Sequence, residues 1–165
     1  MLTAEEADRI AQEAHGSERT KAGLLFIDHV RRVAATVADD PDPDAGVAAL
    51  LHDTVEKGAL TWDDLRAAGA HDRLITVVDA LTEREGEPLT DYLLRCAADP
   101  LALRIKRADI GDKLALTEQD GFTELSLSAI HARANRRLDL LDDLAASLTD
   151  RGAHGSTPLD HGSRS

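Results

Sequence analysis

The sequence predicts a single all-α domain, a bundle of about seven or eight helices, from three observations. The chain has 165 residues, which is the size of one ordinary domain. Aromatic residues make up only 2% of it, so the core must consist of Leu, Ala, Val and Ile, a composition that favours packed helices over a sheet. Apolar residues also recur at helical spacing along most of the chain.

Capping residues and apolar periodicity place the elements. Thr3, Thr61 and Asp72 each stand where a helix N-cap is needed. The domain should span residues 1–148, and the Gly-, Ser- and charge-rich residues 149–165 should form a disordered tail. The expected helices cover roughly residues 3–14, 24–38, 44–57, 61–69, 72–82, 88–97, 99–115 and 123–148.

The charge balance limits the classes of partner. A formal net charge of −12 argues against general nucleic-acid binding, which relies on Lys and Arg, but carboxylate clusters suit divalent cations. The only cysteine, Cys96, excludes an internal disulfide. No apolar run is long enough for a bilayer span and the N-terminus does not read as a signal peptide, so we expect a cytoplasmic protein without a membrane partner. Monomer and homodimer both stay open.

A His-Asp doublet stands where an apolar helix turns polar. His52 and Asp53 directly follow the run 47–51, and a buried His or Asp is costly unless it is hydrogen-bonded or bound to metal. An imidazole nitrogen and a carboxylate oxygen together suit Mn²⁺, Fe²⁺, Co²⁺ or Zn²⁺. The second doublet, His71-Asp72, opens a helix instead, and there an N-cap role for Asp72 is sufficient.

Two further polar residues lie on or beside apolar helical stripes. They are His29 in FIDHVRRVA and Asp109 in IKRADIGDK. Each alone is most simply a hydrogen-bonded, partly buried side chain. The order of one His, then His-Asp, then Asp along the chain is what makes them candidates for a shared site.

This order of motifs resembles the HD superfamily of metal-dependent phosphohydrolases. Within it, the chain is most similar to the hydrolase domain of the RelA/SpoT-homologue group, which removes the 3′-pyrophosphate from (p)ppGpp. That group carries patterns like AHxGQxRKSGEPYIxHPxxVA, HDTVED, T-x-x-DL, VDxxT and KLADRLHN. The counterparts here, within residues 10–115, are AHGSERTKAGLLFIDHVRRVA, HDTVEK, TWDDL, VVDALT and KRADIGDK.

The resemblance implies an HD-type helical bundle that holds one divalent metal ion, generally Mn²⁺. Its ligands would be His29, His52, Asp53 and Asp109. Glu56 is the candidate general base, because a residue four positions after His52 would share its helix face and could reach a water on the metal. The alternative is a solvent-facing glutamate at a helix end.

Cations near the leaving phosphate would stabilise developing charge. Lys57 replaces an aspartate of the family pattern and should either pair with Asp53 or face substrate phosphate. Lys113 replaces the asparagine of the family's nucleotide site. The candidates for substrate binding are Lys21, Arg84, Lys106 and Lys113, although most surface cations are only solvated.

The leading hypothesis is a stand-alone pyrophosphohydrolase that acts on a guanosine 3′-pyrophosphate or a related small nucleotide. A hydrolase of another phosphoester, such as a 5′-nucleotide or NADPH, is the alternative within enzymes. A nucleotide-binding regulator with little or no turnover is the alternative from another class. A purely structural domain would have to treat the His and Asp pattern as coincidence.

Overall fold

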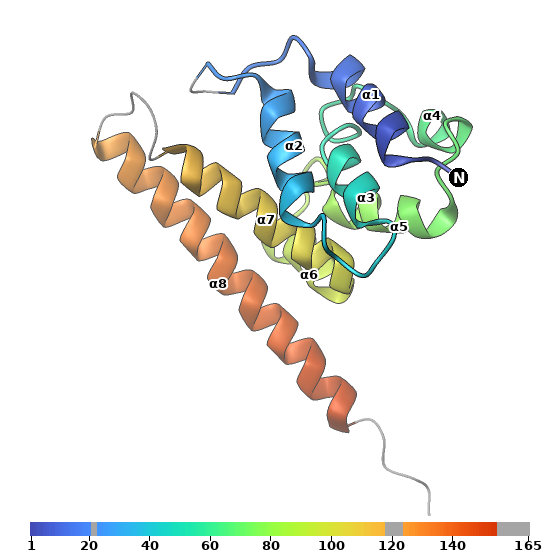
Figure 1. The fold of residues 1–165 in the computed structure, drawn as a ribbon. Coiled ribbons are helices and arrows are strands. Elements are labelled where there is room, and N and C mark those ends of the chain that lie inside the picture. The colour runs from blue at the N-terminus through green and yellow to red at the C-terminus, as the bar shows by residue number, and fades with distance from the viewer. Residues whose placement is uncertain (21–22, 118–123, 155–165) are drawn as a thin grey trace, which may run out of the picture.

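The computed structural model describes residues 1–20, 23–117 and 124–154, and these residues form eight α-helices without a β-strand (Figure 1). The helices are α1 (Ala4–His15), α2 (Phe26–Thr36), α3 (Ala45–Leu51), α4 (Trp62–Ala67), α5 (Asp72–Leu81), α6 (Leu89–Ala98), α7 (Pro100–Thr117) and α8 (Glu124–His154). The predicted all-α class is therefore confirmed. Within the described ranges, no helix is both long and apolar enough to cross a membrane.

The helix starts follow the capping residues with one exception. Thr3 and Thr61 are N-caps, as the sequence predicts, and each also forms a capping box. The N-cap of α5 is His71 and not Asp72, so that prediction is wrong by one residue. The Nδ1 atom of His71 accepts a hydrogen bond from the Leu74 amide at 3.4 Å, and Asp72 occupies the first helical position, where its charge suits the helix dipole.

The third helix ends earlier than the sequence predicts. Helix α3 stops at Leu51, and residues 52–58 form consecutive turns instead of continuing the helix. The Thr54 hydroxyl donates to the Leu51 carbonyl at 2.7 Å, and the Thr54 carbonyl accepts from two later amides at 3.1 Å each. Gly58, with a φ of +71°, then reverses the chain. The His-Asp doublet consequently lies on a turn rather than on a helix face.

The main core surrounds α3. Helices α1, α2, α5 and α7 all pack against this short helix, which presents apolar residues on every side. Its Ala48, Ala49 and Leu51 are fully buried. A helix this apolar is stable only at the centre of a bundle. The turn that follows α3 therefore begins inside the protein.

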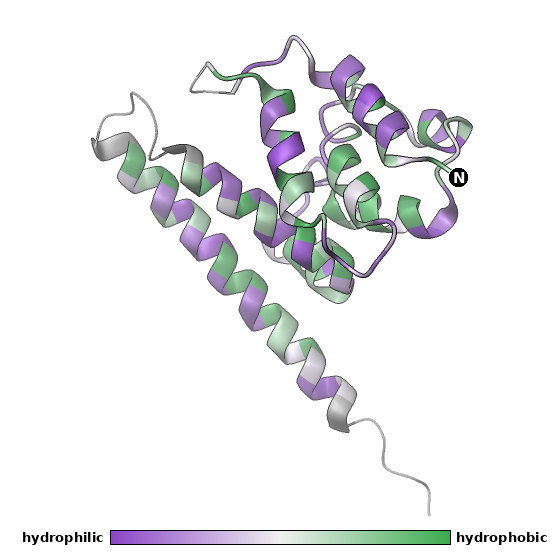
Figure 2. Cartoon of the chain, viewed as in Figure 1, coloured by the Kyte–Doolittle hydropathy of each residue, from purple (hydrophilic) through white to green (hydrophobic). Residues whose placement is uncertain are grey.

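Helix α8 closes the bundle along a separate apolar cluster. It runs beside α6 and α7 and extends past them (Figure 1), with apolar and polar residues interspersed along its length (Figure 2). The buried members of the cluster are Tyr92, Leu93, Cys96, Ala97 and Leu141. Helix α8 continues to His154, so residues 149–154 are helical, while residues 155–165 of the expected tail lie outside the described residues.

Leu141 is the only fully buried residue that the described part of α8 contributes to this cluster. We predict that Leu141→Ala lowers the free energy of unfolding by about 2–5 kcal/mol, because it removes packed methyl groups and leaves a cavity. Urea denaturation measures this change. The matched control is Leu94→Ala on α6, where the side chain is 40% exposed and the expected change is within about 0.5 kcal/mol. Equal effects would contradict the described packing of α8.

Candidate metal centre

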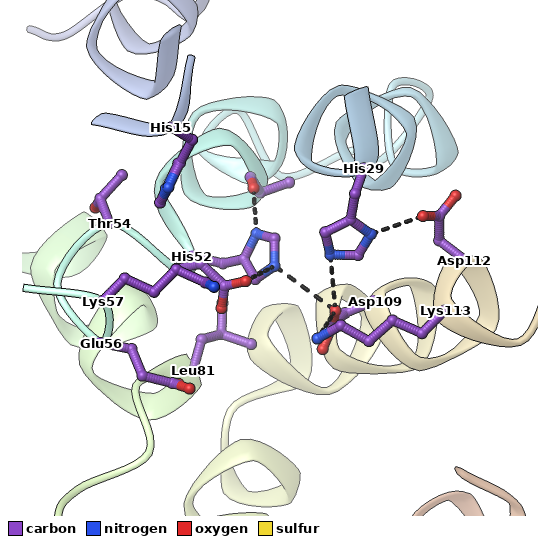
Figure 3. A network of polar contacts seen from close by, with 12 residues as sticks. His15, His29, His52, Thr54, Glu56, Lys57, Leu81, Asp109, Asp112 and Lys113 are labelled. Atoms are coloured by element: carbon purple, nitrogen blue, oxygen red, sulfur yellow. Dashed lines mark hydrogen bonds and ion pairs between the residues drawn. The ribbon is translucent and has the colours of Figure 1, made fainter. Parts of the chain in front are cut away.

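Three separate segments bring four polar side chains to one buried place. Helix α2 supplies His29, the turn after α3 supplies His52 and Asp53, and α7 supplies Asp109. His29, His52 and Asp109 are each 1% exposed and Asp53 is 6% exposed. Figure 3 shows both imidazole rings pointing toward Asp109. The structure thus places together the residues that the sequence nominated as ligands.

Three of the distances between candidate ligand atoms lie between 3.1 and 3.7 Å. Asp109 Oδ1 is 3.1 Å from His29 Nε2 and 3.7 Å from His52 Nε2, and His52 Nε2 is 3.4 Å from Asp53 Oδ2. The atoms offered by His29, His52 and Asp53 all lie within 4.8 Å of one another. Such spacing suits atoms that share one ion, each about 2.1 Å from it.

The Nδ1 atom of each imidazole has a hydrogen-bond partner outside the group of candidate ligand atoms, and this partner fixes the orientation of the ring. His29 Nδ1 lies 2.6 Å from Asp112 Oδ2, and Arg32 binds the other oxygen of Asp112 at 2.7 Å. His52 Nδ1 lies 2.6 Å from the Ala49 carbonyl, which can only accept, so this nitrogen must donate. In the neutral ring, the lone pair of His52 is therefore on Nε2, which faces the centre.

A cation would suit the site if buried acceptor atoms there lack a hydrogen-bond donor. Among the described residues, His29 Nε2 and His52 Nε2 are in this condition. Asp109 Oδ1 makes no hydrogen bond either, although it forms an ion pair with Lys113. Oriented by their outer partners, the two imidazoles turn lone pairs toward a carboxylate oxygen, and acceptors that converge in this way repel one another. A divalent cation would relieve that repulsion, and imidazole with carboxylate is a suitable donor set for it.

Two lysines of α7 neutralise Asp109. Lys106 Nζ lies 2.8 Å from Oδ2, and Lys113 Nζ lies 2.7 Å from Oδ1. Burial raises the pKa of Asp109, but the two ammonium groups outweigh this and hold the pKa well below its ordinary value. Burial likewise lowers the pKa of Lys106, and the charge of Asp109 reverses that effect, so the Lys106 pKa is raised well above its ordinary value.

The charges of the doublet also stabilise each other. Burial raises the pKa of Asp53. The charges of His52 and Lys113 lower it by more than burial raises it, so the net shift is downward. Burial lowers the pKa of His52, while Asp53 and Asp109 raise it, and the net shift is upward. Asp112 behaves like Asp53, because Arg32 and His29 overcome the effect of burial and lower its pKa. The carboxylates of the site are therefore ionised at neutral pH.

Glu56 lies on the turn and not on a helix face, so the geometric reason that the sequence suggested for it is wrong. Its Oε2 atom accepts a hydrogen bond from the Glu83 amide at 3.0 Å. Glu56 is exposed as a residue, but desolvation of its carboxyl group raises its pKa. The hydrogen bond from Glu83 lowers the pKa and the charge of Asp53 raises it, and the net shift is upward. A carboxylate with a raised pKa next to the doublet is still chemically suited to accept a proton.

Lys57 does not pair with Asp53, which corrects one of the two roles that its spacing predicted. Its ammonium group binds Glu18 and lies 4.0 Å from the centre of the Phe26 ring. His15 Nδ1 lies 3.0 Å from the same glutamate, and the His15 ring packs on Phe26. Sequence reasoning passed over His15, although it is 1% exposed and its Nε2 has no hydrogen-bond partner.

The predicted substrate-binding cations occupy different environments. Lys106 and Lys113 lie within the centre, on Asp109. Arg84 pairs with Asp79 at 2.8 Å. Lys21 lies outside the described residues. Contacts of these four side chains with a substrate stay predictions.

Sequence reasoning also missed a group of arginines on α8. A pocket of about 410 Å³ is lined by Leu89, Ala132, Arg133, Arg136 and Arg137. Glu83 connects this pocket to the doublet's turn, because its carboxylate lies 3.8 Å from Arg137 and its amide binds Glu56. The signal in the sequence is the run ARANRR, whose spacing of three and four residues places the arginines on one helix face.

Similarity to solved structures defines the class of fold. The chain superposes with a TM-score of 0.71 on the structure of a metazoan orthologue of SpoT, which hydrolyses ppGpp and plays a role in starvation responses. The two are 22% identical, and the match covers 92% of this chain and 95% of the other. The predicted HD-type helical fold is therefore confirmed.

Curated relatives agree with the family resemblance. The chain is 30% identical over 118 residues to the guanosine-3′,5′-bis(diphosphate) 3′-pyrophosphohydrolase of Aquifex aeolicus, a match that covers 64% of this chain and 17% of the relative. It is 31% identical over 115 residues to the GTP pyrophosphokinase of Streptomyces coelicolor, covering 64% and 14%. The chain thus spans less than a fifth of the length of these relatives. No family model matches it.

The hydrogen bonds of the two doublets predict opposite tautomers. Neutral His52 should carry its proton on Nδ1, which donates to a carbonyl, whereas neutral His71 should carry it on Nε2, because its Nδ1 accepts from the Leu74 amide. Long-range ¹H–¹⁵N NMR of the metal-free protein, at a pH where both rings are neutral, distinguishes these forms. An Nε2-protonated His52 would show that the described orientation of its ring is incorrect.

Proposed function

We propose that the chain is a metal-dependent hydrolase that removes the 3′-pyrophosphate from a guanosine bis-diphosphate. The observation that carries this proposal is the convergence of His29, His52, Asp53 and Asp109, in which Asp112 and a backbone carbonyl orient the two imidazoles. Such outer partners typically accompany histidines that bind metal. The similarity to ppGpp-hydrolysing proteins supports the choice of substrate.

The four side chains would hold one divalent ion. Mn²⁺ is our choice, and the donor set also suits Fe²⁺, Co²⁺ or Zn²⁺. When bound, such an ion supplies Lewis acidity, which lowers the pKa of water and polarises a phosphoryl oxygen. The protein's own part is to keep both imidazole lone pairs directed inward, through Asp112 behind His29 and the Ala49 carbonyl behind His52.

Glu56 is the proposed general base. Its carboxylate would take a proton from the attacking water as that water adds to the phosphorus next to the 3′ oxygen. The bond from phosphorus to the 3′ oxygen would then break, and this oxygen would take up the proton held by Glu56. Pyrophosphate would leave, and the nucleotide would keep a 3′-hydroxyl. The raised pKa of Glu56 supports this role, because a base works best when its pKa lies near the operating pH.

The arginine pocket offers a place for the remaining phosphates. Arg133 and Arg136 are exposed and Arg137 is partly buried, in a chain whose formal net charge is −12. Their planar guanidinium groups suit bidentate contact with phosphate oxygens. Glu83 supports this assignment, because its carboxylate lies 3.8 Å from Arg137 and its amide donates to the proposed base Glu56 at 3.0 Å.

A hydrolase of another phosphoester, such as a 5′-nucleotide or NADPH, is the second candidate. Lys57 and Lys113 favour it, because both replace residues of the family pattern and both are bound to carboxylates here. A regulator that binds nucleotide without turnover is the third reading. The cytoplasmic location of the protein stays a prediction, and both the monomer and the homodimer stay open.

We predict Mn²⁺-dependent release of pyrophosphate from ppGpp. The measurement is phosphate and pyrophosphate release from a panel of ppGpp, pppGpp, NADPH and 5′-mononucleotides, with Mn²⁺ or with chelator. If another compound of the panel is hydrolysed and ppGpp is not, the substrate assignment is wrong and the proposed metal centre stands. If no compound is hydrolysed but a nucleotide binds tightly, the regulator is favoured.

Two histidine variants serve as a matched pair in this assay. His52→Ala should abolish both Mn²⁺ binding and hydrolysis. His71→Ala removes a helix cap and the contact of Nε2 with the buried Asp44 carboxylate at 3.0 Å, so it should cost roughly 1–3 kcal/mol of stability but keep activity near wild type. Equal loss of activity in two folded variants would show that the wrong doublet has been assigned to the centre.

We predict that Glu56→Gln keeps Mn²⁺ affinity but slows turnover by roughly 10²- to 10⁴-fold, because the amide cannot accept the proton. Since its pKa is raised, the wild-type rate should fall on the acidic side at a pH above the ordinary glutamate value. Rate–pH profiles measure both effects. Glu85→Gln, a change at an exposed glutamate, is the control. An unaffected rate in Glu56→Gln would remove Glu56 from the mechanism.

A further inference from the structure

Lys113 places its ammonium group where a metal ion would need to approach Asp109. Its Nζ atom lies 2.7 Å from Oδ1, the same oxygen that is 3.1 Å from His29 Nε2 and 3.7 Å from His52 Nε2. Lys106 binds the other oxygen of the carboxylate at 2.8 Å. Figure 3 shows Lys113 reaching along α7 to Asp109. Asp109 Oδ1 therefore binds the Lys113 ammonium group and is also the oxygen that a metal ion between the imidazoles would contact.

The formal charges of the centre are balanced when both lysines are in place. In the form that binds metal, in which both imidazoles are neutral, Asp53 and Asp109 contribute two negative charges and Lys106 and Lys113 contribute two positive charges. Unpaired charge is costly in a buried site. A divalent ion that entered with both ammonium groups unmoved would meet strong repulsion, so one of the two must give way.

The two lysines differ in their freedom to move. The Lys106 side chain is 7% exposed, and its ammonium group lies 5.1 Å from the centre of the Tyr92 ring. The Lys113 side chain is 47% exposed and lies near the end of α7. A lysine has a flexible four-carbon stem and a strongly hydrated head. Lys113 can therefore turn its head into solvent, whereas Lys106 is confined.

We propose that Lys113 is an internal counter-cation of the metal-free centre and that a divalent ion displaces it from Asp109 Oδ1 on binding. This inference rests on the proposed function, since it assumes that Asp109 is a metal ligand. The ion pair stabilises the folded protein without metal and lowers its affinity for metal. Lys113, which stands where the family pattern has asparagine, therefore raises the metal concentration at which the centre is half occupied.

The first test compares Lys113→Met with wild type after both proteins are stripped with chelator. Calorimetric titration with Mn²⁺ alone should show tighter binding in the variant, by roughly 5- to 150-fold, the usual range for coupling between two binding events. Thermal unfolding of the metal-free variant should begin at a lower temperature. Lys113→Arg, which keeps the charge, should bind Mn²⁺ more nearly like wild type. Arg107→Met controls for the loss of a positive charge elsewhere on α7, because Arg107 pairs with Asp142 instead.

A second test needs no substitution. Reductive methylation followed by mass spectrometry reports how accessible each lysine amine is in the wild-type protein. Lys113 should react more readily once Mn²⁺ is added, and Lys106 should stay protected in both states. Lys113 reactivity that is unchanged or reduced by Mn²⁺ would overturn the proposal even where Lys113→Met fails to fold.

The outcomes separate this inference from the proposed function. If His52→Ala abolishes Mn²⁺ binding while Lys113→Met binds as wild type does, or more weakly, the displacement of Lys113 is refuted and the metal centre stands. If wild type, Lys113→Met and His52→Ala all fail to bind Mn²⁺, the metal centre itself is refuted, and the displacement with it.

Discussion

The buried carboxylate of Asp109 is the interaction on which the centre depends. It lies within reach of two histidines and two lysines, and these come from α2, from the turn after α3, and from α7 itself. A buried carboxylate is costly unless it is paired, so the three segments must meet correctly for the fold to be stable. The same requirement brings the imidazoles into one place. Folding stability and the assembly of the centre are therefore linked through a single side chain.

Much of the fold and of the candidate centre was predictable because it depends on local sequence patterns, such as helix caps and apolar runs. Thr3 and Thr61 cap helices in the way that their positions indicate, and His52 stands out because it ends an apolar run. The local hydrogen bonds of Thr54 decided that residues 52–58 form turns, and apolar periodicity gives no sign of such bonds. The cap of α5 moved to His71 because an imidazole nitrogen can accept an amide proton as a carboxylate oxygen does.

Contacts between distant residues could not be predicted from spacing. His29 meets Asp112 across 83 residues, and Lys57 meets Glu18 across 39. Both pairings depend on how helices and turns pack, and a single sequence does not reveal this. Cations were hardest to assign, because composition does not distinguish a paired arginine such as Arg84 from one that lines a pocket, such as Arg136. The candidate metal ligands were easier to recognise, because burial of a polar group demands an explanation.

The separate apolar cluster beneath α8 has a consequence for the dynamics of the protein. The candidate ligands lie against the main core, while α8 is attached through a small cluster centred on Tyr92 and Leu141. Cooperative units with few buried contacts open at lower free energy than the global unfolding transition. Amide protons of α8 should therefore exchange through local opening, while those of α3 exchange only on global unfolding. The proposed phosphate-binding pocket and the candidate metal centre would then belong to two units of different stability within one small domain.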